Sequence, residues 1–120
     1  MAKHSIVHIE LSAADPKAAG DFYKKLFGWK IDVDERSKYV QFTPEEGSGG
    51  GFNQVGENAK AGDVLVYVST DDIEASLAKA EKLGGKRLVP KTEIPGFGWF
   101  AIFSDPTGNK LGLYTAMNPQ

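Results

Sequence analysis

The feature that most constrains the fold of this chain is an internal duplication. The segment DPKAAGDFYKKLFGWKI at 15–31 matches DIEASLAKAEKLGGKRL at 72–88, with Leu26 corresponding to Leu83 at an offset of 57 residues. Both segments end in a glycine-containing turn after a stretch of the same length. Self-similarity at such a period is typical of a duplicated supersecondary unit. The chain is therefore expected to fold as two similar modules.

Each module is expected to begin with a strand. In IVHIELS at 6–12 and in DVLVYVS at 63–69, side chains of two kinds alternate along the chain. Alternation with a period of two indicates a strand with two different faces. The aliphatic faces carry Val7, Ile9 and Leu11, and Val64, Val66 and Val68, while the opposite faces carry His8, Glu10 and Ser12, and Leu65, Tyr67 and Ser69.

A capped helix is expected after each strand. In the first module, the side chain of Asp15 can cap the helix N-terminus, and Pro16 suits the first helical position. In the second module, Asp71 and Glu74 have the spacing of a capping box. The two helices should therefore begin near residues 16 and 72.

Both helices carry an apolar stripe that we expect to pack on the aliphatic strand faces. Gly28, and Gly84 or Gly85, are expected to end the helices, because glycine tolerates the left-handed conformation of a C-terminal cap. The stripes consist of Phe22, Tyr23, Leu26 and Phe27 in the first helix, and of Ile73, Leu77, Ala80 and Leu83 in the second.

Three short strands are expected after each helix, near 29–34, 37–43 and 50–55 and then near 86–90, 98–104 and 110–116. The sequence thus predicts an α+β fold with two βαβββ modules in a single domain of 120 residues. Module 1 covers about 4–58 and module 2 about 62–117. If the modules join their strands into one curved mixed sheet, the helices cover its convex side and the polar strand faces line a cup.

Composition excludes several classes of function. The chain has no cysteine, which removes disulfides, thiolate metal sites and thiol catalysis. Its net charge of −2 gives no reason to expect nucleic acid or an anionic membrane as a partner. The N-terminal apolar stretch is interrupted by His4 and Glu10, so we expect no signal peptide and no membrane span. The expected location is the cytoplasm.

Three segments together resemble the vicinal oxygen chelate superfamily, which includes glyoxalase I, extradiol dioxygenases and bleomycin-resistance proteins. They are HIELSAADPKAAGDFYKKLFGW in the first half, and VSTDDIEASLAKAEKLGGK and GFGWFAIFSDPTGNKLGLY in the second. The resemblance covers nearly the whole chain. It implies two βαβββ modules that form a cup-shaped sheet. In the enzymes of the superfamily, that cup holds a divalent metal with one ligand from each of four strands.

The resemblance assigns those four ligand positions to His8, Gly51, Leu65 and Gly112. Only His8 can ligate a metal, because leucine and glycine have no donor atom in the side chain. The superfamily usually has a glutamate where this chain has Gly112. We therefore expect no metal cofactor.

A weaker divalent site remains an alternative at His8 and Glu10. The two residues are about 6.6 Å apart along a strand and could lean toward one ion. Gln54 would add at most a neutral oxygen donor. Glu10 could instead act alone as a general acid or base.

The leading hypothesis is a metal-independent protein that binds a small, flat or aromatic molecule in the cup. Gly51 and Gly112 are expected to leave space for that ligand. The alternatives are a lyase, isomerase or dioxygenase with an atypical metal site, a metal-free catalyst that uses Glu10, and an interaction module whose cup is filled. A homodimer is expected. The predicted lining consists of His8, Glu10, Gly51, Gln54, Leu65, Tyr67, Trp99, Gly112 and Tyr114.

Overall fold

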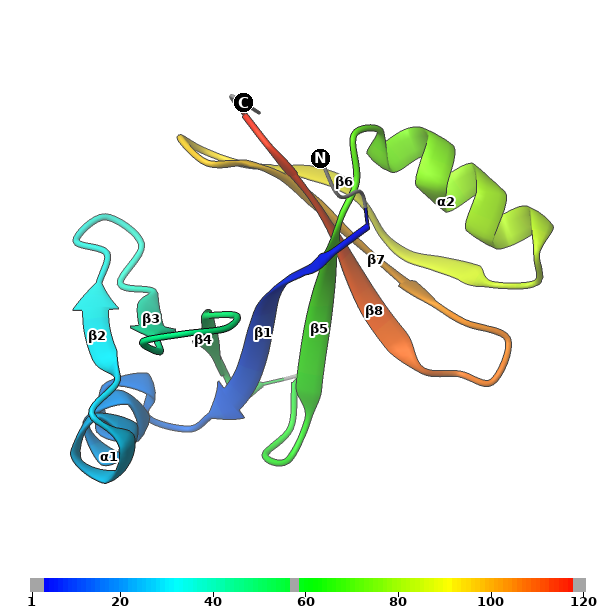
Figure 1. Ribbon diagram of the computed structural model, residues 1–120. Coiled ribbons are helices and arrows are strands. Elements are labelled where there is room, and N and C mark those ends of the chain that lie inside the picture. Colours follow the sequence, from blue (N-terminus) through cyan, green and yellow to red (C-terminus); the bar gives the residue numbers. More distant parts are fainter. Residues whose placement is uncertain (1–3, 57–58, 118–120) are drawn as a thin grey trace. The chain divides into compact units, whose positions relative to one another are not determined.

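A computed structural model describes residues 4–56 and 59–117 of the chain. These residues form two compact units (Figure 1). We call 7–65 the N-terminal module, and we call 66–117, together with 4–6, the C-terminal module.

The N-terminal module contains five elements in the predicted order. They are β1 (Ile6–Ala13), α1 (Pro16–Phe27), β2 (Lys30–Val33), β3 (Val40–Thr43) and β4 (Gly50–Gln54). The strands lie in the order β2-β3-β4-β1. Strand β1 is parallel to β4, and the other neighbours are antiparallel.

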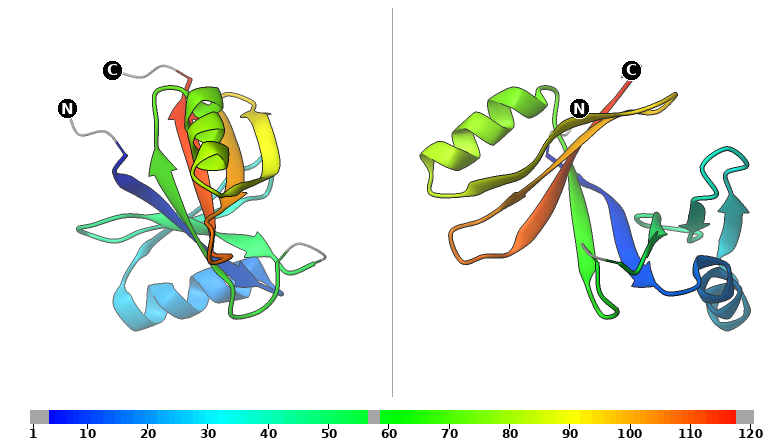
Figure 2. Two further views of the ribbon diagram at one scale, coloured as in Figure 1. Left: turned by 90° about the vertical axis from the view of Figure 1, so that its right-hand side faces the viewer. Right: turned by 180° about the vertical axis from the view of Figure 1, so that it is seen from behind.

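The C-terminal module repeats this arrangement. Its elements are β5 (Val64–Ser69), α2 (Ile73–Lys82), β6 (Lys86–Ile94), β7 (Gly98–Ser104) and β8 (Lys110–Ala116). The strand order is β5-β8-β7-β6, with β5 parallel to β8 and the remaining neighbours antiparallel. Each helix covers one face of the strands of its own module (Figure 2). The α+β class and the duplicated βαβββ order are confirmed, whereas the cup stays a prediction from the sequence.

The caps agree with the sequence in the first helix and differ by one residue in the second. Asp15 accepts a hydrogen bond from the amide of Ala18 at 3.2 Å, and Gly28 ends α1 in the left-handed region with φ 75°. The cap of α2 is Asp72, which accepts from the amide of Ala75 at 3.0 Å. The expected capping box at Asp71 is therefore wrong, because α2 begins at Ile73 and its first free amides lie within reach of the nearer carboxylate.

The cores of the two modules have different chemical character. In the N-terminal module, Val40, Phe42 and Phe52 are buried, and the rings of Tyr23 and Trp29 pack against them. Trp29 stacks on Phe42 with ring centroids 4.7 Å apart. The core of the C-terminal module is mainly aliphatic and is formed by Ile73, Leu77, Ala101 and Leu113.

The expected helix stripes are only partly buried. Ile73 and Leu77 are buried as predicted, but Leu26 is 57% exposed and Leu83 is 70% exposed. Phe22 and Phe27 are also exposed. In α1 the sheet is contacted through Ala19, Gly20 and Tyr23. Around the helix axis, Phe22 lies roughly 100° from the centre of that face and Leu26 lies roughly 70° from it. Leu83 lies beyond the last residue of α2.

None of the helices in the described ranges is long and apolar enough to cross a membrane.

Candidate functional site

The face of the N-terminal sheet opposite α1 carries the polar residues of β1. Leu11 and Ala13 pack into the core beneath α1, so strand alternation turns His8 and Glu10 to the other face. Glu10 lies opposite Gly51 of β4 in the parallel pairing. The sequence prediction that these three positions share a face is consistent with this register.

Tyr39, which immediately precedes β3, completes this group. Its hydroxyl donates a hydrogen bond to Oε2 of Glu10 at 2.7 Å and lies 2.9 Å from Nε2 of His8. The imidazole and phenol rings are nearly parallel, with centroids 6.2 Å apart. We call His8, Glu10 and Tyr39 the polar trio. Its members come from positions that are up to 31 residues apart in the chain.

The direction of these hydrogen bonds fixes the protonation of the trio. A carboxylate can only accept, so the proton of the Tyr39 hydroxyl points to Glu10. The phenol oxygen must then accept from Nε2–H of His8, which makes Nδ1 the unprotonated nitrogen of the neutral ring. Burial lowers the pKa of His8 below its ordinary value of 6.5, and the nearby charge of Glu10 opposes that effect. The neutral imidazole is therefore favoured at neutral pH.

Sequence reasoning missed Tyr39, although a signal for it was present. Val40 and Phe42 face the core, so alternation places Tyr39 and Gln41 on the opposite face. Gln41 pairs with Gly51 across β3 and β4. Tyr39 lies on the same face as Gln41 and two residues before it, so its ring is a candidate to cover Gly51.

The two glycines that were expected to leave open space are covered by rings instead. A Cβ atom at Gly51 would lie 2.5 Å from Cε2 of Tyr39, and one at Gly112 would lie 2.9 Å from Cγ of Tyr67. Both distances are shorter than carbon atoms allow in normal packing. The expectation of empty space at these glycines is wrong in this conformation, because each glycine makes room for an aromatic side chain of its own module.

The C-terminal module separates the remaining aromatic candidates onto two faces. Tyr67 lies opposite Gly112, and Tyr114 follows two residues later on the same face. The hydroxyl of Tyr114 donates to the carbonyl of Phe97 at 3.1 Å, and burial raises its pKa. Trp99 instead packs against the core beneath α2, with the ammonium of Lys91 5.2 Å from its ring centroid. The expected place of Trp99 in the lining is therefore wrong, since it lies on the helix side of β7.

Two further candidates lie apart from the polar trio. Gln54 is exposed at the end of β4, where its side-chain amide donates to the carbonyl of Ala14 at 2.7 Å. Leu65 is half-buried in β5. An open pocket of about 280 Å³ adjoins the trio at His8. Its walls are Val7, His8, Gln41, Phe42, Thr43, Gly49 and Gly50.

The metal that the resemblance implies does not fit these residues. Of its four ligand positions, only His8 has donor atoms in its side chain, and its Nε2 is bonded to the Tyr39 hydroxyl. The Tyr39 ring occupies the place of a side chain at Gly51, and the Tyr67 ring does so at Gly112. Within the described ranges, no three or more histidine, aspartate or glutamate side chains are grouped closely enough to hold a metal ion.

Comparisons with known proteins agree on the family. The sequence model of a protein family described as the glyoxalase-like domain matches residues 8–114. A glyoxylase-like domain-containing protein of Didymella fabae is 32% identical, over 89% of this chain and 90% of that protein. The anthracycline biosynthesis protein DnrV of Streptomyces peucetius is 29% identical over 88% of this chain.

Some relatives are longer than this chain. The chain spans 44% of DnrV and 44% of CFP32, a protein of Mycobacterium tuberculosis that is provisionally named a glyoxylase. Among solved structures, a glyoxalase/bleomycin resistance protein/dioxygenase superfamily member from Vibrio splendidus aligns with a TM-score of 0.67 at 14% identity, over 93% of this chain and 98% of that chain. The structural likeness concerns the fold, and the family match covers nearly the whole sequence. The chain belongs to the family of glyoxalase-like domains.

Proposed function

We propose that this protein binds a small, flat aromatic molecule without a metal, on the face of the N-terminal module that carries the polar trio. The observation that carries the proposal is the hydrogen-bonded arrangement of His8, Tyr39 and Glu10 above a glycine. A carboxylate acceptor, an imidazole and a phenol within one small area can orient a polar ring substituent. The rest of the ligand would extend toward the open pocket beside His8.

The chemistry of the trio favours ligands with hydroxyl groups on an aromatic ring. Glu10 accepts a hydrogen bond and carries a negative charge, so it disfavours ligand carboxylates. DnrV is named as an anthracycline biosynthesis protein. Anthracyclines contain a planar anthraquinone ring system with phenolic hydroxyl groups. That relative supports planar, hydroxylated aromatics as the ligand class. The ligand roles of Leu65, Tyr67 and Tyr114 stay predictions.

A titration with doxorubicin, followed by its fluorescence with EDTA present, tests the proposal. We expect saturable binding that EDTA does not abolish. Glu10→Gln should weaken binding by about tenfold or more, because a hydrogen bond to a charged acceptor contributes roughly 1.5–3 kcal/mol. Lys79→Ala, an exposed change on α2, is the matched control and should bind as the wild type does.

Two results would contradict the proposal. One is binding that disappears with EDTA and returns with a divalent metal. The other is an affinity that falls equally in Glu10→Gln and Lys79→Ala. A folded protein that binds none of a panel of planar aromatics would favour the interaction-module alternative.

A second candidate function is metal-free proton transfer by Glu10. The direct hydrogen bond between its carboxylate and the Tyr39 hydroxyl favours this function, because it gives the carboxylate a proton-bearing partner. Incubation of a bound hydroxylated ligand in deuterated water, followed by NMR, measures exchange of its acidic C–H protons. Exchange that the wild type accelerates and Glu10→Gln does not would establish catalysis. Equal rates in both proteins would exclude this role for that ligand.

A further inference from the structure

The phenol side chain of Tyr39 lies over Gly51 in a space that the glycine leaves, and its hydroxyl meets one donor and one acceptor. We propose that this space is a phenol-binding subsite and that Tyr39 is its resident occupant, which the phenolic ring of a ligand displaces. The inference deepens the proposed function and rests on it, because it names the part of the ligand that His8 and Glu10 recognise.

The first argument concerns the reason for glycine at position 51. The described glycines with positive φ, such as Gly28 and Gly47, have a conformational reason to be glycine, but Gly51 is not among them. Its backbone is an ordinary strand that any residue could adopt. The observed reason is steric, since a Cβ atom at Gly51 would collide with the ring of Tyr39. Position 51 is therefore shaped for an aromatic ring.

The second argument concerns the hydroxyl group. A phenol in water donates one hydrogen bond and accepts others, and in this structure the Tyr39 hydroxyl donates to Glu10 and accepts from His8. A ligand phenol can make the same pair of bonds. A site built to bond a hydroxyl rejects an analogue that lacks it, because the buried polar groups then lose their partner.

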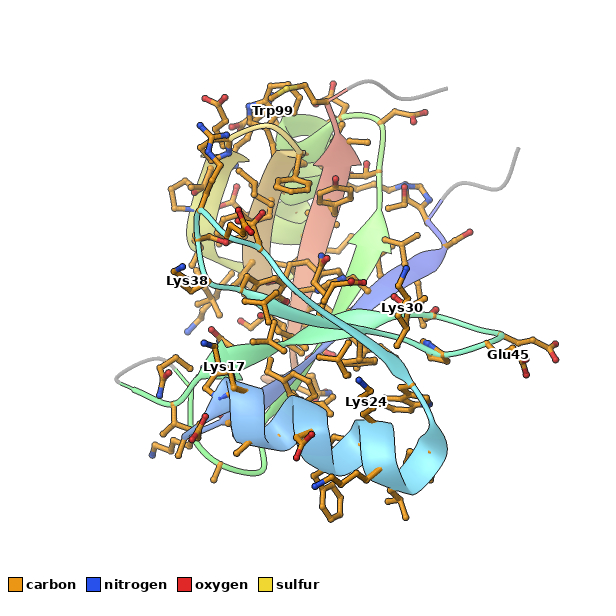
Figure 3. All side chains as sticks on the ribbon, turned by 90° about the vertical axis from the view of Figure 1, so that its left-hand side faces the viewer. Lys17, Lys24, Lys30, Lys38, Glu45 and Trp99 are labelled. Atoms are coloured by element: carbon orange, nitrogen blue, oxygen red, sulfur yellow. The ribbon has the colours of Figure 1, made fainter. Side chains whose placement is uncertain are left out.

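The third argument concerns how Tyr39 can leave. Its backbone is fixed by the β2–β3 connection, where the amide of Asp34 donates to the Tyr39 carbonyl at 2.9 Å. The amide of Tyr39 donates to Oγ of Ser37 at 3.2 Å. Displacement thus requires rotation of the side chain only, and the turn can stay intact. Lys38, labelled in Figure 3, marks the position of this turn.

The experiment uses 4-methylphenol, which is the tyrosine side chain without its backbone, and toluene, which lacks the hydroxyl. Both are titrated into the wild type, Tyr39→Ala and Tyr39→Phe, and binding is measured by NMR shift perturbation and thermal stabilisation. We expect Tyr39→Ala to bind 4-methylphenol about tenfold or more tighter than toluene, because two hydrogen bonds separate the two probes. The wild type and Tyr39→Phe, whose rings still cover Gly51, should bind it at least about tenfold more weakly than Tyr39→Ala.

A double variant locates the binding. Gly51→Leu in the Tyr39→Ala background places a side chain in the vacated space, so binding of 4-methylphenol should disappear. If Tyr39→Ala is unfolded alone, 4-methylphenol should restore its circular dichroism spectrum and toluene should not, since a ligand of the native state shifts the folding equilibrium.

Three results would overturn the inference. They are equal binding of 4-methylphenol and toluene to Tyr39→Ala, no binding of either probe, and binding that survives Gly51→Leu. Its failure is distinct from failure of the proposed function. Doxorubicin binding to the wild type with no 4-methylphenol binding to Tyr39→Ala would retain the proposed function and remove the subsite. Binding of 4-methylphenol to Tyr39→Ala, with no binding of doxorubicin to the wild type, would retain the subsite and remove the proposed ligand class.

Discussion

The two modules have the same order of elements, but they pack helix against sheet in opposite ways. In the C-terminal module, Leu77 of α2 is fully buried against Ala101 of β7, so the helix supplies the large side chain. The corresponding pair in the N-terminal module is Gly20 of α1 and Val40 of β3. A Cβ atom at Gly20 would lie 3.2 Å from Cγ1 of Val40, so the sheet supplies the volume there. Duplicated backbones can therefore keep one architecture while large and small residues exchange sides.

The modules also cover their strand glycines differently. Gly51 is covered by Tyr39, which immediately precedes the neighbouring antiparallel strand β3, and the Tyr39 hydroxyl is held by Glu10 and His8. Gly112 is covered by Tyr67, which lies directly opposite in the parallel strand β5. The comparison indicates that the ring cover is common to both modules, whereas the bonded polar trio belongs to the first.

The largest expected effect on stability comes from Leu77, the large helix residue that packs against the sheet in the C-terminal module. Leu77→Ala should lower the free energy of unfolding by about 2–5 kcal/mol, because it removes a fully buried side chain. Leu83→Ala, the same change at an exposed leucine just after α2, should cost less than about 0.5 kcal/mol. Urea denaturation measures both values. Equal losses in the two variants would contradict the burial of α2 described above.

A second prediction compares the two covered glycines. Gly51→Ala and Gly112→Ala should each destabilise by about 1–3 kcal/mol, because the new methyl group overlaps a ring. We expect Gly112→Ala to cost more, since Tyr67 is 9% exposed in the middle of a strand, whereas Tyr39 is half-buried beside a turn. Most of the cost of Gly51→Ala should vanish in a Tyr39→Ala background. If Gly51→Ala destabilises the wild type and Tyr39→Ala by the same amount, the overlap with the Tyr39 ring is not the cause.

The third prediction compares the helix caps. Asp15→Ala and Asp72→Ala should each cost about 1 kcal/mol, because each removes the acceptor of a first-turn amide. Asp71→Ala is the matched control and should cost clearly less than Asp72→Ala. Thermal unfolding of the three variants decides the order. A larger loss for Asp71→Ala would restore the capping box that the sequence suggested.

The last prediction concerns pH and the polar trio. Because burial holds the pKa of His8 in the native state below 6.5, the unfolded chain binds more protons as the pH falls through this region. The free energy of unfolding should therefore decrease as the pH falls below 6.5, until the native pKa has been passed. In His8→Gln this contribution should be missing, and stability should depend less steeply on pH. Denaturation curves across this pH range measure the slope, and an unchanged slope would contradict the burial effect.

The sequence predicted the elements well because their local signals agree. Strand β7 lies at Gly98–Ser104, as expected from the residues alone, and both strand–helix starts follow the duplication. Strand β6 was predicted to end near 90 but continues to Ile94. The residue at 90 is proline, which normally argues against a strand interior, and irregular register on either side of Val89 accommodates it.

Side-chain environments were harder to predict because they depend on packing across the sheet. The apolar stripe of α1 is wider than the face that the sheet can cover, so Leu26 is left exposed. Trp99 lies two residues from the buried Ala101 in β7, so both face the helix side, opposite to the face to which Trp99 was assigned. Tyr39 was missed since its role depends on the β3–β4 register, which brings it over Gly51. The sequence indicated that His8 and Glu10 share a polar face, but it did not indicate that both bond to Tyr39.

The irregularity of β6 has a consequence for how the molecule behaves at high concentration. Strand β6 is the edge strand of the C-terminal module. An edge strand offers unpaired backbone groups to other chains. Pro90 lacks an amide hydrogen, the register shifts on both sides of Val89, and Lys86 and Lys91 add positive charge. A foreign strand therefore finds no continuous, flat ladder to extend. We therefore expect this edge to resist aggregation through strand addition.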